Sequence, residues 1–465
     1  KPIKFVRVCE SLTCELFGAQ KLLKELKTIK KTNIRVVPGP CMGRCDVAPT
    51  VCVGKNYVDK ASVDKVEEVI KNNNFNAIIP KYISLNDYKK NGGYEIIKKI
   101  KEGKITNKQI IEILKDSGLK GKGGAGFPTG MKWEIVSKYT GKKYVAVNGD
   151  EGEPGTFKDR YYLERDPHRF LEGALIASLF IKALNVYIYI RDEYPSVIKI
   201  LKDEIKKLEM ENIIEKGHFI VRRGAGAYIC GEESALIESV EGKRGIPRHR
   251  PPYVAQNGVY GLPTLVHNVE TVYWIREIFE KGSKWFLSFG RNNRTGLRSF
   301  SVSGFVKSPG VKLAPAGISV LELINEYCGG MMDGHKFIAY LPGGASGGIL
   351  PATMSNIPLD FDTLQDYGCF IGSAAIVIIS DQIDIKDVAL NLMKFFEDES
   401  CGQCTPCRNG TTMAVKLMKE KKWNIKILEE VGNVMTDASI CGLGQAAANP
   451  LTCILKYFPE QVNSI

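Results

Sequence analysis

The sequence predicts a multidomain α/β protein, and three observations lead to this fold class. The 465 residues are enough for about three average domains. Apolar residues make up 44% of the chain and charged residues 25%, as is usual for proteins with well-filled cores. Runs with strand and helix periodicity alternate through most of the chain, then give way to short β-rich runs and finally to a helical tail.

Residues 1–80 predict a small α/β domain. Its expected elements are, in order, strand 4–8, helix 19–26, strand 34–37, strand 50–53 and helix 63–70. This order resembles a thioredoxin-like domain. The next segment, 81–106, is polar and rich in lysine, and we expect it to be a linker.

Residues 107–295 predict the main layered α/β domain. A helix is expected at 107–117, and strands are expected at 144–147, 186–190 and 219–221. The most apolar window of the chain, 173–190, contains Lys182 and Asn185. A membrane-spanning helix needs about 20 apolar residues with few or no charges, so we interpret this window as a buried helix followed by a buried strand.

Two smaller domains are expected to follow. Residues 296–385 predict a separate α+β domain, with strands at 299–306, 337–341 and 374–379 and a helix at 320–327. Residues 386–465 predict a helical domain that carries two cysteine-bearing loops.

The net charge of +12 has two interpretations. The simpler one is a lysine-rich surface, and the functional one is attraction of anionic dinucleotides and acidic partner subunits. No basic run is interleaved with aromatic residues, so we expect no nucleic-acid binding. No secretion or twin-arginine leader is recognised, so we expect a cytoplasmic protein that does not insert into a membrane and reaches one only through a partner.

The 13 cysteines gather near both ends of the chain, and an odd number argues against a disulfide framework. Cys401, Cys404 and Cys407 form a C-x2-C-x2-C run, and Cys441 follows later. Three closely spaced thiolates can reach three corners of a [4Fe–4S] cube, and a distant fourth closes the cage. The alternative is a structural zinc site, which usually uses two C-x2-C pairs.

A glycine-dense run covers residues 120–130. Gly121, Gly123 and Gly126 fit the pattern G-x-G-x-x-G, but a helix precedes them where the dinucleotide fingerprint needs a strand. Backbone N–H groups of such a loop can still approach a phosphate closely. Positive charge would come from three lysines: Lys120, Lys122 and Lys132. The alternative is a plain flexible turn.

Acidic residues follow two of the expected strands. Asp150, Glu151 and Glu153 come after strand 144–147, and a second glycine turn at 223–234 contains Glu232 and Glu233. Open α/β sheets bind ligands at the carboxyl ends of their strands. Carboxylates there can bind ribose and ribityl hydroxyls and the nicotinamide carboxamide, and they repel a 2′-phosphate, which favours NADH over NADPH. A solvated acidic turn is the alternative for either loop alone.

Four motifs, at 121–130, 148–155, 224–233 and 399–408, together resemble the NADH-binding, FMN-containing subunit of respiratory complex I and its soluble relatives. The resemblance covers roughly residues 110–450 and keeps the motif order of the family. It implies a Rossmann-like FMN and NADH domain, then a ubiquitin-like domain, then a four-helix cluster domain.

The resemblance also implies the binding residues. Those implied for FMN are Gly121, Gly123, Lys132, Asn148, Asp150, Glu151, Gly231, Glu232, Asn268 and Thr271. NADH is implied to stack over the flavin beside Phe127, to meet Glu153 and Glu233, and to have Arg250 and Tyr253 on its adenine side. The chain departs from the family at four positions: Arg250 replaces a common Lys, Tyr253 a Phe, His267 an Asn and Ile135 a Phe.

The first cysteines form two pairs, Cys9-x4-Cys14 and Cys41-x3-Cys45. They resemble the thioredoxin-like [2Fe–2S] subunit that partners this family, here fused in front. Two thiolate pairs, one per iron, are what a two-iron cluster needs. A zinc site, or a cluster lost in this branch, remains open.

Three kinds of fused relative compete. Bifurcating hydrogenase subunits usually carry a further ferredoxin domain, and complex I subunits usually lack the fused front domain. The stretches 161–170, 248–253 and 341–348 most resemble the flavoprotein (beta) subunit of NAD-dependent formate dehydrogenase. Its partners would be a molybdenum or tungsten catalytic subunit, or a hydrogenase-type one, together with a small [2Fe–2S] subunit.

The resemblance implies an enzyme that moves hydride between nicotinamide and FMN and then single electrons to iron–sulfur clusters. No side chain need act as an acid or base in the hydride step. The alternatives are the diaphorase subunit of a soluble NAD-linked hydrogenase or of complex I, and a non-catalytic scaffold that only relays electrons.

Overall fold

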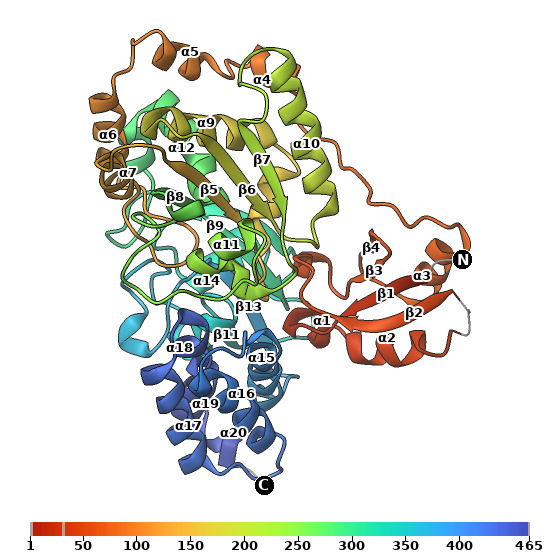
Figure 1. Cartoon of the computed structure of the whole chain (residues 1–465). Coiled ribbons are helices and arrows are strands. Elements are labelled where there is room, and N and C mark those ends of the chain that lie inside the picture. The colour runs from red at the N-terminus through yellow and green to blue at the C-terminus, as the bar shows by residue number, and fades with distance from the viewer. Residues whose placement is uncertain (1–2, 30–32, 464–465) are drawn as a thin grey trace.

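A computed structural model describes residues 3–29 and 33–463. Figure 1 shows the first domain (red) beside the main body, with the parallel sheet at one end of that body and the helical tail (blue) at the other. No helix among these residues is both long enough and apolar enough to cross a lipid bilayer.

The first domain is a four-stranded sheet in the order β2-β1-β3-β4 with helices packed on it. Strand β1 runs parallel to β2 and antiparallel to β3. Its elements are β1 (Lys4–Cys9), α1 (Leu12–Leu16), α2 (Ala19–Leu26), β2 (Ile34–Gly39), β3 (Val51–Val53), β4 (Asn56–Val58) and α3 (Val63–Lys71). The expected strands and helices are all present, and the thioredoxin-like fold is confirmed.

The segment 81–106 differs from the predicted linker, because it folds into α4 (Leu85–Lys90) and α5 (Glu95–Lys101). Tyr88 and Tyr94 are buried, and their hydroxyl groups bond Glu172 Oε2 at 2.6 Å and His168 Nδ1 at 2.9 Å. The many lysines of this segment face solvent, and their number made the few apolar residues of α4 and α5 difficult to recognise in the sequence.

The main domain is built on a fully parallel sheet in the order β7-β6-β5-β8. Numbered within the domain, this is 3-2-1-4, the start of the doubly wound Rossmann order. The strands are β5 (Tyr144–Gly149), β6 (Asn185–Ile190), β7 (Phe219–Arg223) and β8 (Thr264–Asn268). The chain reverses its direction of winding between β5 and β8, and ligands bind at such a switch point.

Helices cover both faces of this sheet. Successive strand residues point to opposite sides of the sheet, and the side chains on both sides are apolar. Val145, Val147 and Ile188 pack on the face covered by α9 and α12. Ala146 and Tyr189 pack on the opposite face, with α11. The helices are α6 (Asn107–Asp116), α7 (Thr129–Ser137), α8 (Lys158–Leu163), α9 (Pro167–Ile181), α10 (Pro195–Met210), α11 (Glu233–Val240), α12 (Val269–Lys281) and α13 (Ser283–Leu287).

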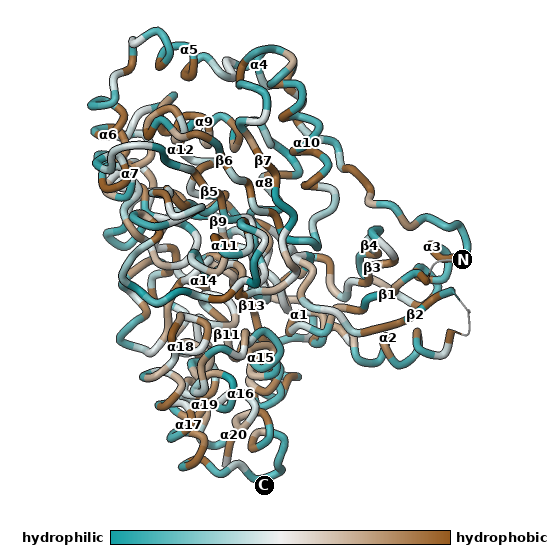
Figure 2. Tube along the Cα trace, in the orientation of Figure 1, coloured by the Kyte–Doolittle hydropathy of each residue, from teal (hydrophilic) through white to brown (hydrophobic). Residues whose placement is uncertain are grey.

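The most apolar window of the sequence is confirmed as a helix, α9, followed by a buried strand, β6. In Figure 2 the hydrophobic colour is concentrated on central elements such as these, whereas an outer helix such as α10 alternates between the two colours.

The third domain is a five-stranded mixed sheet in the order β10-β9-β13-β11-β12. Its first and last strands, β9 and β13, lie side by side in parallel at the centre, as in ubiquitin-like domains. The elements are β9 (Leu297–Gly304), β10 (Gly310–Pro315), α14 (Val320–Glu322), β11 (Phe337–Leu341), β12 (Leu350–Pro351) and β13 (Ala375–Ser380). The sequence had not predicted the short strands β10 and β12.

The tail is helical, as predicted. Its helices are α15 (Ile385–Glu399), α16 (Thr405–Met418), α17 (Ile425–Ala438), α18 (Gly442–Ala446), α19 (Asn449–Tyr457) and α20 (Pro459–Asn463). One continuous apolar core joins this bundle to the third domain and to the α11 face of the parallel sheet, through residues such as Phe396, Ile378 and Leu236. The three domains therefore pack as one body around the switch point.

Candidate functional site

A cavity of about 900 Å³ opens at the carboxyl edge of the parallel sheet, between the ends of β5 and β8. Its walls bring together the glycine loop 121–127, the acidic loop 148–153, the second glycine turn and the end of β8. Of the fifteen residues implied for FMN and NADH, only Thr271 does not line it. Thr271 instead supports the glycine loop, since its Oγ1 accepts the N–H of Lys122 at 2.8 Å.

The glycine loop is a closed turn pressed against the end of β8. Its base is fixed by the N–H of Gly121, which donates to the carbonyl of Phe127 at 2.9 Å. A Cβ on Gly123 would lie 3.0 Å from Cβ of Asn268, so a side chain there would push the loop off the strand. The loop therefore presents bare backbone to the cavity, as a phosphate cradle requires.

The charge predicted for this loop is only partly present. Lys132 lines the cavity, but Lys120 instead pairs with Asp362 at 3.4 Å. Lys122 is buried and donates from Nζ to the carbonyl of Leu297 at 3.2 Å, and burial lowers its pKa to about 7. The expectation that Lys122 adds charge to the phosphate loop is wrong, because its long side chain turns into the protein core.

Asp150 offers the clearest attachment point for a ligand. It lies at the end of β5 in the cavity wall, and its Oδ2 is buried without a hydrogen-bond partner among the described residues. Burial raises the pKa of Asp150 to about 8. A buried polar atom without a partner is costly, and a ligand hydroxyl would satisfy this one. The ribityl chain of FMN carries such hydroxyls, so this residue fits the cofactor.

Glu151 lines the cavity, but protein groups occupy both oxygens of its carboxylate. They accept the N–H groups of Asp159 at 2.8 Å and Arg160 at 3.1 Å, which caps the start of α8, and the hydroxyl of Tyr194 at 2.9 Å. Burial, with the nearby charge of Asp159, raises the pKa of Glu151 to about 7. Its carboxylate therefore holds the acidic loop in place.

Glu153 ties the cavity to the third domain. Its Oε1 accepts both the N–H, at 2.9 Å, and the hydroxyl of Ser346, and its Oε2 accepts the hydroxyl of Ser373 at 3.3 Å. The carbonyl of Ser346 in turn accepts a hydrogen bond from Asn449 Nδ2 at 2.9 Å. Ser346 is thus bonded to the main domain on one side and to the helical tail on the other.

A cluster of charged groups lies where the second glycine turn meets the cavity. Glu232 caps α11 by accepting the N–H groups of Ser234 and Ala235, both at 2.9 Å, and it also pairs with Arg250. Glu233 lies 3.5 Å from Lys132 Nζ and 3.6 Å from Arg250. The carboxylates thus hold two cations at the cavity wall.

Two aromatic side chains of the cavity are exposed. Phe127 is 43% exposed and Tyr253 is 53% exposed, which is high for rings of this size in a folded domain. Flat aromatic surfaces of this kind stack on nicotinamide and adenine rings.

Sequence reasoning missed two groups, one in the cavity wall and one behind it. Lys158 is buried and meets Asp159 at 2.7 Å, Glu270 at 3.2 Å and Asn268 Oδ1 at 3.1 Å. Burial lowers its pKa, but the surrounding carboxylates outweigh burial and raise it overall, so Lys158 is charged. The only available signal was its position directly after the acidic loop, in a chain full of lysines.

The second missed group is Trp133, whose indole N–H donates to Nε2 of His267 at 2.7 Å. Burial, together with the charge of Lys132, holds the pKa of His267 well below its usual range. The histidine is therefore neutral in the cavity wall.

The cysteines of the tail adjoin this cavity. Cys441 is the N-cap of α18, and the two residues after it, Gly442 and Leu443, line the cavity. Burial raises the pKa of Cys407 to about 11, and the charges of Cys404, Cys441 and Cys401 add to that effect. An iron–sulfur cluster on this set would lie just behind the cavity wall.

The cysteines of the first domain form a second, fully buried set. Cys41 and Cys45 Sγ lie 3.6 Å apart, and the thiols of Cys14 and Cys41 raise the pKa of Cys9 well above its usual range. Two thiolates bound tetrahedrally to one metal at about 2.3 Å are roughly 3.8 Å apart, so the distance between Cys41 and Cys45 fits two ligands of one iron. Among the described residues, no three metal-binding side chains converge on a single ion. The ligands of an iron–sulfur cluster are distributed over several irons, so they need not converge on one ion.

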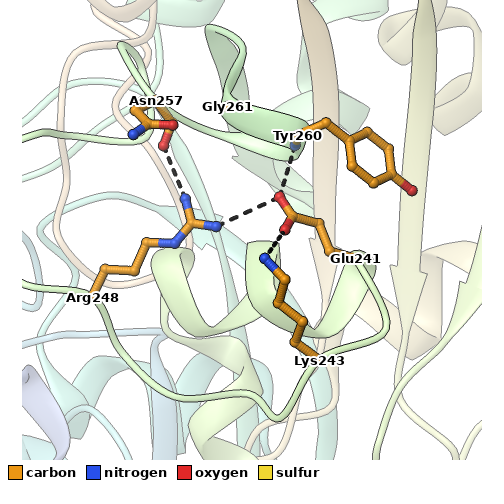
Figure 3. Close-up of a pocket in the computed structure, with 6 residues that line it drawn as sticks. All are labelled: Glu241, Lys243, Arg248, Asn257, Tyr260 and Gly261. Atoms are coloured by element: carbon orange, nitrogen blue, oxygen red, sulfur yellow. Dashed lines mark hydrogen bonds and ion pairs between the residues drawn. The ribbon is translucent and has the colours of Figure 1, made fainter.

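A smaller hollow of about 530 Å³ lies next to the end of α11 (Figure 3). Glu241 accepts the N–H of Tyr260 at 2.7 Å and pairs with Lys243 at 2.7 Å and with Arg248 at 3.5 Å. Arg248 also donates to the carbonyl of Asn257 at 3.0 Å. These charges satisfy one another and hold the 257–261 turn on the helix end.

Three family models match the chain: the Nuo51 FMN-binding domain at residues 114–277, the NADH-ubiquinone oxidoreductase-F iron–sulfur binding region at 387–464, and the thioredoxin-like [2Fe–2S] ferredoxin at 2–74. The FMN, [4Fe–4S] and [2Fe–2S] modules expected from the sequence are thereby confirmed.

Similar proteins and structures agree with these models. An NADH-quinone oxidoreductase subunit of Rhizobium meliloti is 41% identical over 398 residues, which are 82% of this chain and 94% of the relative. The mitochondrial NADH dehydrogenase flavoprotein 1 of Dictyostelium discoideum is 41% identical over 372 residues, which are 76% of this chain and 78% of the relative. The NAD+-reducing [NiFe]-hydrogenase in its H2-reduced state matches with a TM-score of 0.88 at 28% identity, over 99% of this chain and 84% of that chain. The chain therefore belongs to the family of NADH-binding flavoprotein subunits, with FMN and iron–sulfur clusters, that includes the 51 kDa-like subunit of NADH-quinone oxidoreductase.

Proposed function

We propose that this chain is the flavoprotein (beta) subunit of an NAD-dependent formate dehydrogenase. In it, the cavity at the end of β5 would hold FMN and NAD(H), and the two sets of cysteines would hold the iron–sulfur clusters. The observation that carries the electron-transfer role is that Gly442 and Leu443, next to Cys441, form part of the cavity wall. This supports a short path from the flavin to the C-terminal cluster.

When bound, FMN exchanges a hydride with nicotinamide and single electrons with iron–sulfur clusters. The chain's residues bind and orient it. The backbone of the glycine loop and Lys132 would hold the phosphate, and Asp150 Oδ2 would accept a ribityl hydroxyl. Phe127 and Tyr253 would supply stacking surface for the dinucleotide.

Discrimination between the dinucleotides would come from the charged cluster at the second glycine turn. Glu233 already occupies the cations Lys132 and Arg250, and its own charge would repel a 2′-phosphate. In the proposed clusters, Cys401, Cys404, Cys407 and Cys441 hold [4Fe–4S], and Cys9, Cys14, Cys41 and Cys45 hold [2Fe–2S].

The choice of formate rests on three stretches of the sequence, 161–170, 248–253 and 341–348. The stretch 248–253 borders the cavity with Arg250 and Tyr253, and 341–348 contains Ser346, which holds Glu153. Formate oxidation itself would take place on a partner subunit with molybdenum or tungsten. A second candidate is the diaphorase subunit of an NAD-linked hydrogenase, because the solved hydrogenase chain matches 99% of this chain, including the fused first domain.

Two measurements test the proposal. The full chain, purified without oxygen, should release flavin on acid treatment and should catalyse the reduction of ferricyanide by NADH. A protein that contains iron but neither flavin nor NADH activity would be a relay scaffold instead. A tagged copy captured from its host should bring down a subunit with molybdenum or tungsten and support formate-dependent NAD+ reduction. Hydrogen-dependent or quinone-dependent activity in that sample would replace formate with the corresponding alternative.

A further inference from the structure

One buried cation connects the cavity to the cysteines of the first domain. Arg191 directly follows β6 and is 3% exposed. Its guanidinium donates to the carbonyl of Glu151 at 2.5 Å, to the carbonyl of Cys41 at 2.5 Å and to Oε2 of Glu193 at 2.9 Å. It therefore touches a cavity-lining residue, a cysteine of the [2Fe–2S] domain and one carboxylate.

The surrounding contacts press the cysteine loop 41–46 onto the main domain. A second buried arginine, Arg160, donates to the carbonyl of Gly43 at 2.8 Å and pairs with Asp46 at 3.3 Å. A Cβ on Gly43 would lie 2.0 Å from the hydroxyl of Tyr194, the N-cap of α10, so no side chain fits between the loop and this tyrosine. Arg160 pairs with two carboxylates, Asp46 and Glu164 at 2.8 Å. Arg191 pairs with one, Glu193, and it is the arginine that donates to the backbone carbonyl of a cysteine.

We propose that Arg191 is a positioning residue that holds the Cys41 loop against the flavin cavity and raises the reduction potential of the [2Fe–2S] cluster. The inference rests on the proposed ligation of that cluster by the first four cysteines. Reduction adds one negative charge to the cluster, and its potential depends on nearby charge and hydrogen bonds. A fixed positive charge stabilises the reduced form, more strongly where water is excluded.

Glu193 has the opposite effect on the same cluster. Its carboxylate is the partner of Arg191 and neutralises part of its charge. Replacing Arg191 by Gln should therefore move the midpoint potential of the cluster in the negative direction, and replacing Glu193 by Gln should move it in the positive direction. Arg191→Lys, which keeps the charge but loses the fork of donors, should shift it less than Arg191→Gln.

The test is a redox titration of the anaerobically purified full chain, followed by the EPR signal of the reduced [2Fe–2S] cluster. The [4Fe–4S] signal of the same sample is the internal reference. Arg223→Gln is the matched control, because it removes the same charge from the end of the neighbouring strand β7, where Arg223 is exposed and pairs with Asp192 at 2.6 Å. It should leave the potential of the cluster unchanged.

Opposite shifts for Arg191→Gln and Glu193→Gln, with no shift for Arg223→Gln, would support the proposal. Equal potentials in all variants, or shifts of one sign, would overturn it. If Arg191→Gln loses its cluster, Glu193→Gln decides alone: a positive shift supports the proposal, and no shift rejects it. If the unmodified chain shows no [2Fe–2S] signal, the cluster assignment itself fails and takes this inference with it.

Discussion

The indole N–H of Trp133 donates to Nε2 of His267 at 2.7 Å in the wall of the flavin cavity. An indole nitrogen is a donor only, so Nε2 must accept, and the proton of the neutral ring is on Nδ1. The bond fixes both the ring plane and the tautomer of a residue that, in the family, is commonly an asparagine.

Trp133→Phe should therefore leave His267 Nε2 without its partner. We expect a loss of about 1–3 kcal/mol in the free energy of unfolding, together with weaker flavin retention. Denaturant unfolding and the flavin-to-protein ratio after desalting measure the two effects. Trp423→Phe is the control, because Trp423 is also buried and donates to the carbonyl of Met418, but it lies in the helical tail. It should lose stability and keep its flavin; equal flavin loss in both would contradict the role of the bond.

Asp150 predicts a pH dependence for the flavin-free protein. Its pKa is raised from 3.8 to about 8, so the unfolded chain binds fewer protons than the folded one between these values. Stability from this group is complete below about pH 4 and is lost as the pH rises towards 8. Asp150→Asn should remove this loss and be the more stable protein at pH 8, by roughly 1–3 kcal/mol. Thermal melting of the flavin-free proteins at pH 6 and pH 8 tests this; a gap that does not widen with pH would count against it.

Glu233→Ala should relax selectivity for NADH. The change frees Lys132, which lies 3.5 Å from the carboxylate, to meet a 2′-phosphate, and it removes a negative charge 3.6 Å from Arg250. We expect kcat/KM with NADPH to rise by about tenfold, equivalent to about 1.4 kcal/mol. The ratio of kcat/KM for the two dinucleotides is the measurement. Glu215→Ala removes an exposed carboxylate elsewhere on the main domain and should leave that ratio as it is.

Cys404→Ala should abolish the [4Fe–4S] cluster while the flavin stays bound, because the glycine loop and Asp150 do not depend on that thiolate. The EPR spectrum of the reduced protein and its iron content report the loss. Cys453→Ala is a matched control in the same domain, since Cys453 is buried beside Cys369, with the sulfurs 3.5 Å apart, and lies outside the proposed set. Its cluster signal should match that of the unmodified chain.

Several elements were predictable because their signal is local. Strands β5, β6 and β7 each contain a continuous apolar run, and the cysteine spacings are short-range patterns. Strand β8 was missed because Thr264, His267 and Asn268 make it look like a loop, although its pairing with β5 buries it. The pairing of two strands that are distant in the sequence cannot be predicted from the residues of either strand alone.

The same limit applies within the site. The acidic and glycine loops could be identified as ligand-binding from residue type and position. The inward turn of Lys122, the buried charge of Lys158 and the reach of Arg191 to Cys41 depend on which segments the fold brings together. These are long-range contacts made by arginine and lysine, residues that are common throughout this chain.

Ser346 links the main domain, the third domain and the helical tail. Through Glu153 on one side and Asn449 on the other, a single residue of the third domain helps to set the spacing between the flavin cavity and the cysteine bundle. Tunnelling rates fall steeply with distance, so that spacing determines how fast electrons cross. The third domain thus helps to hold the two redox sites at a defined separation.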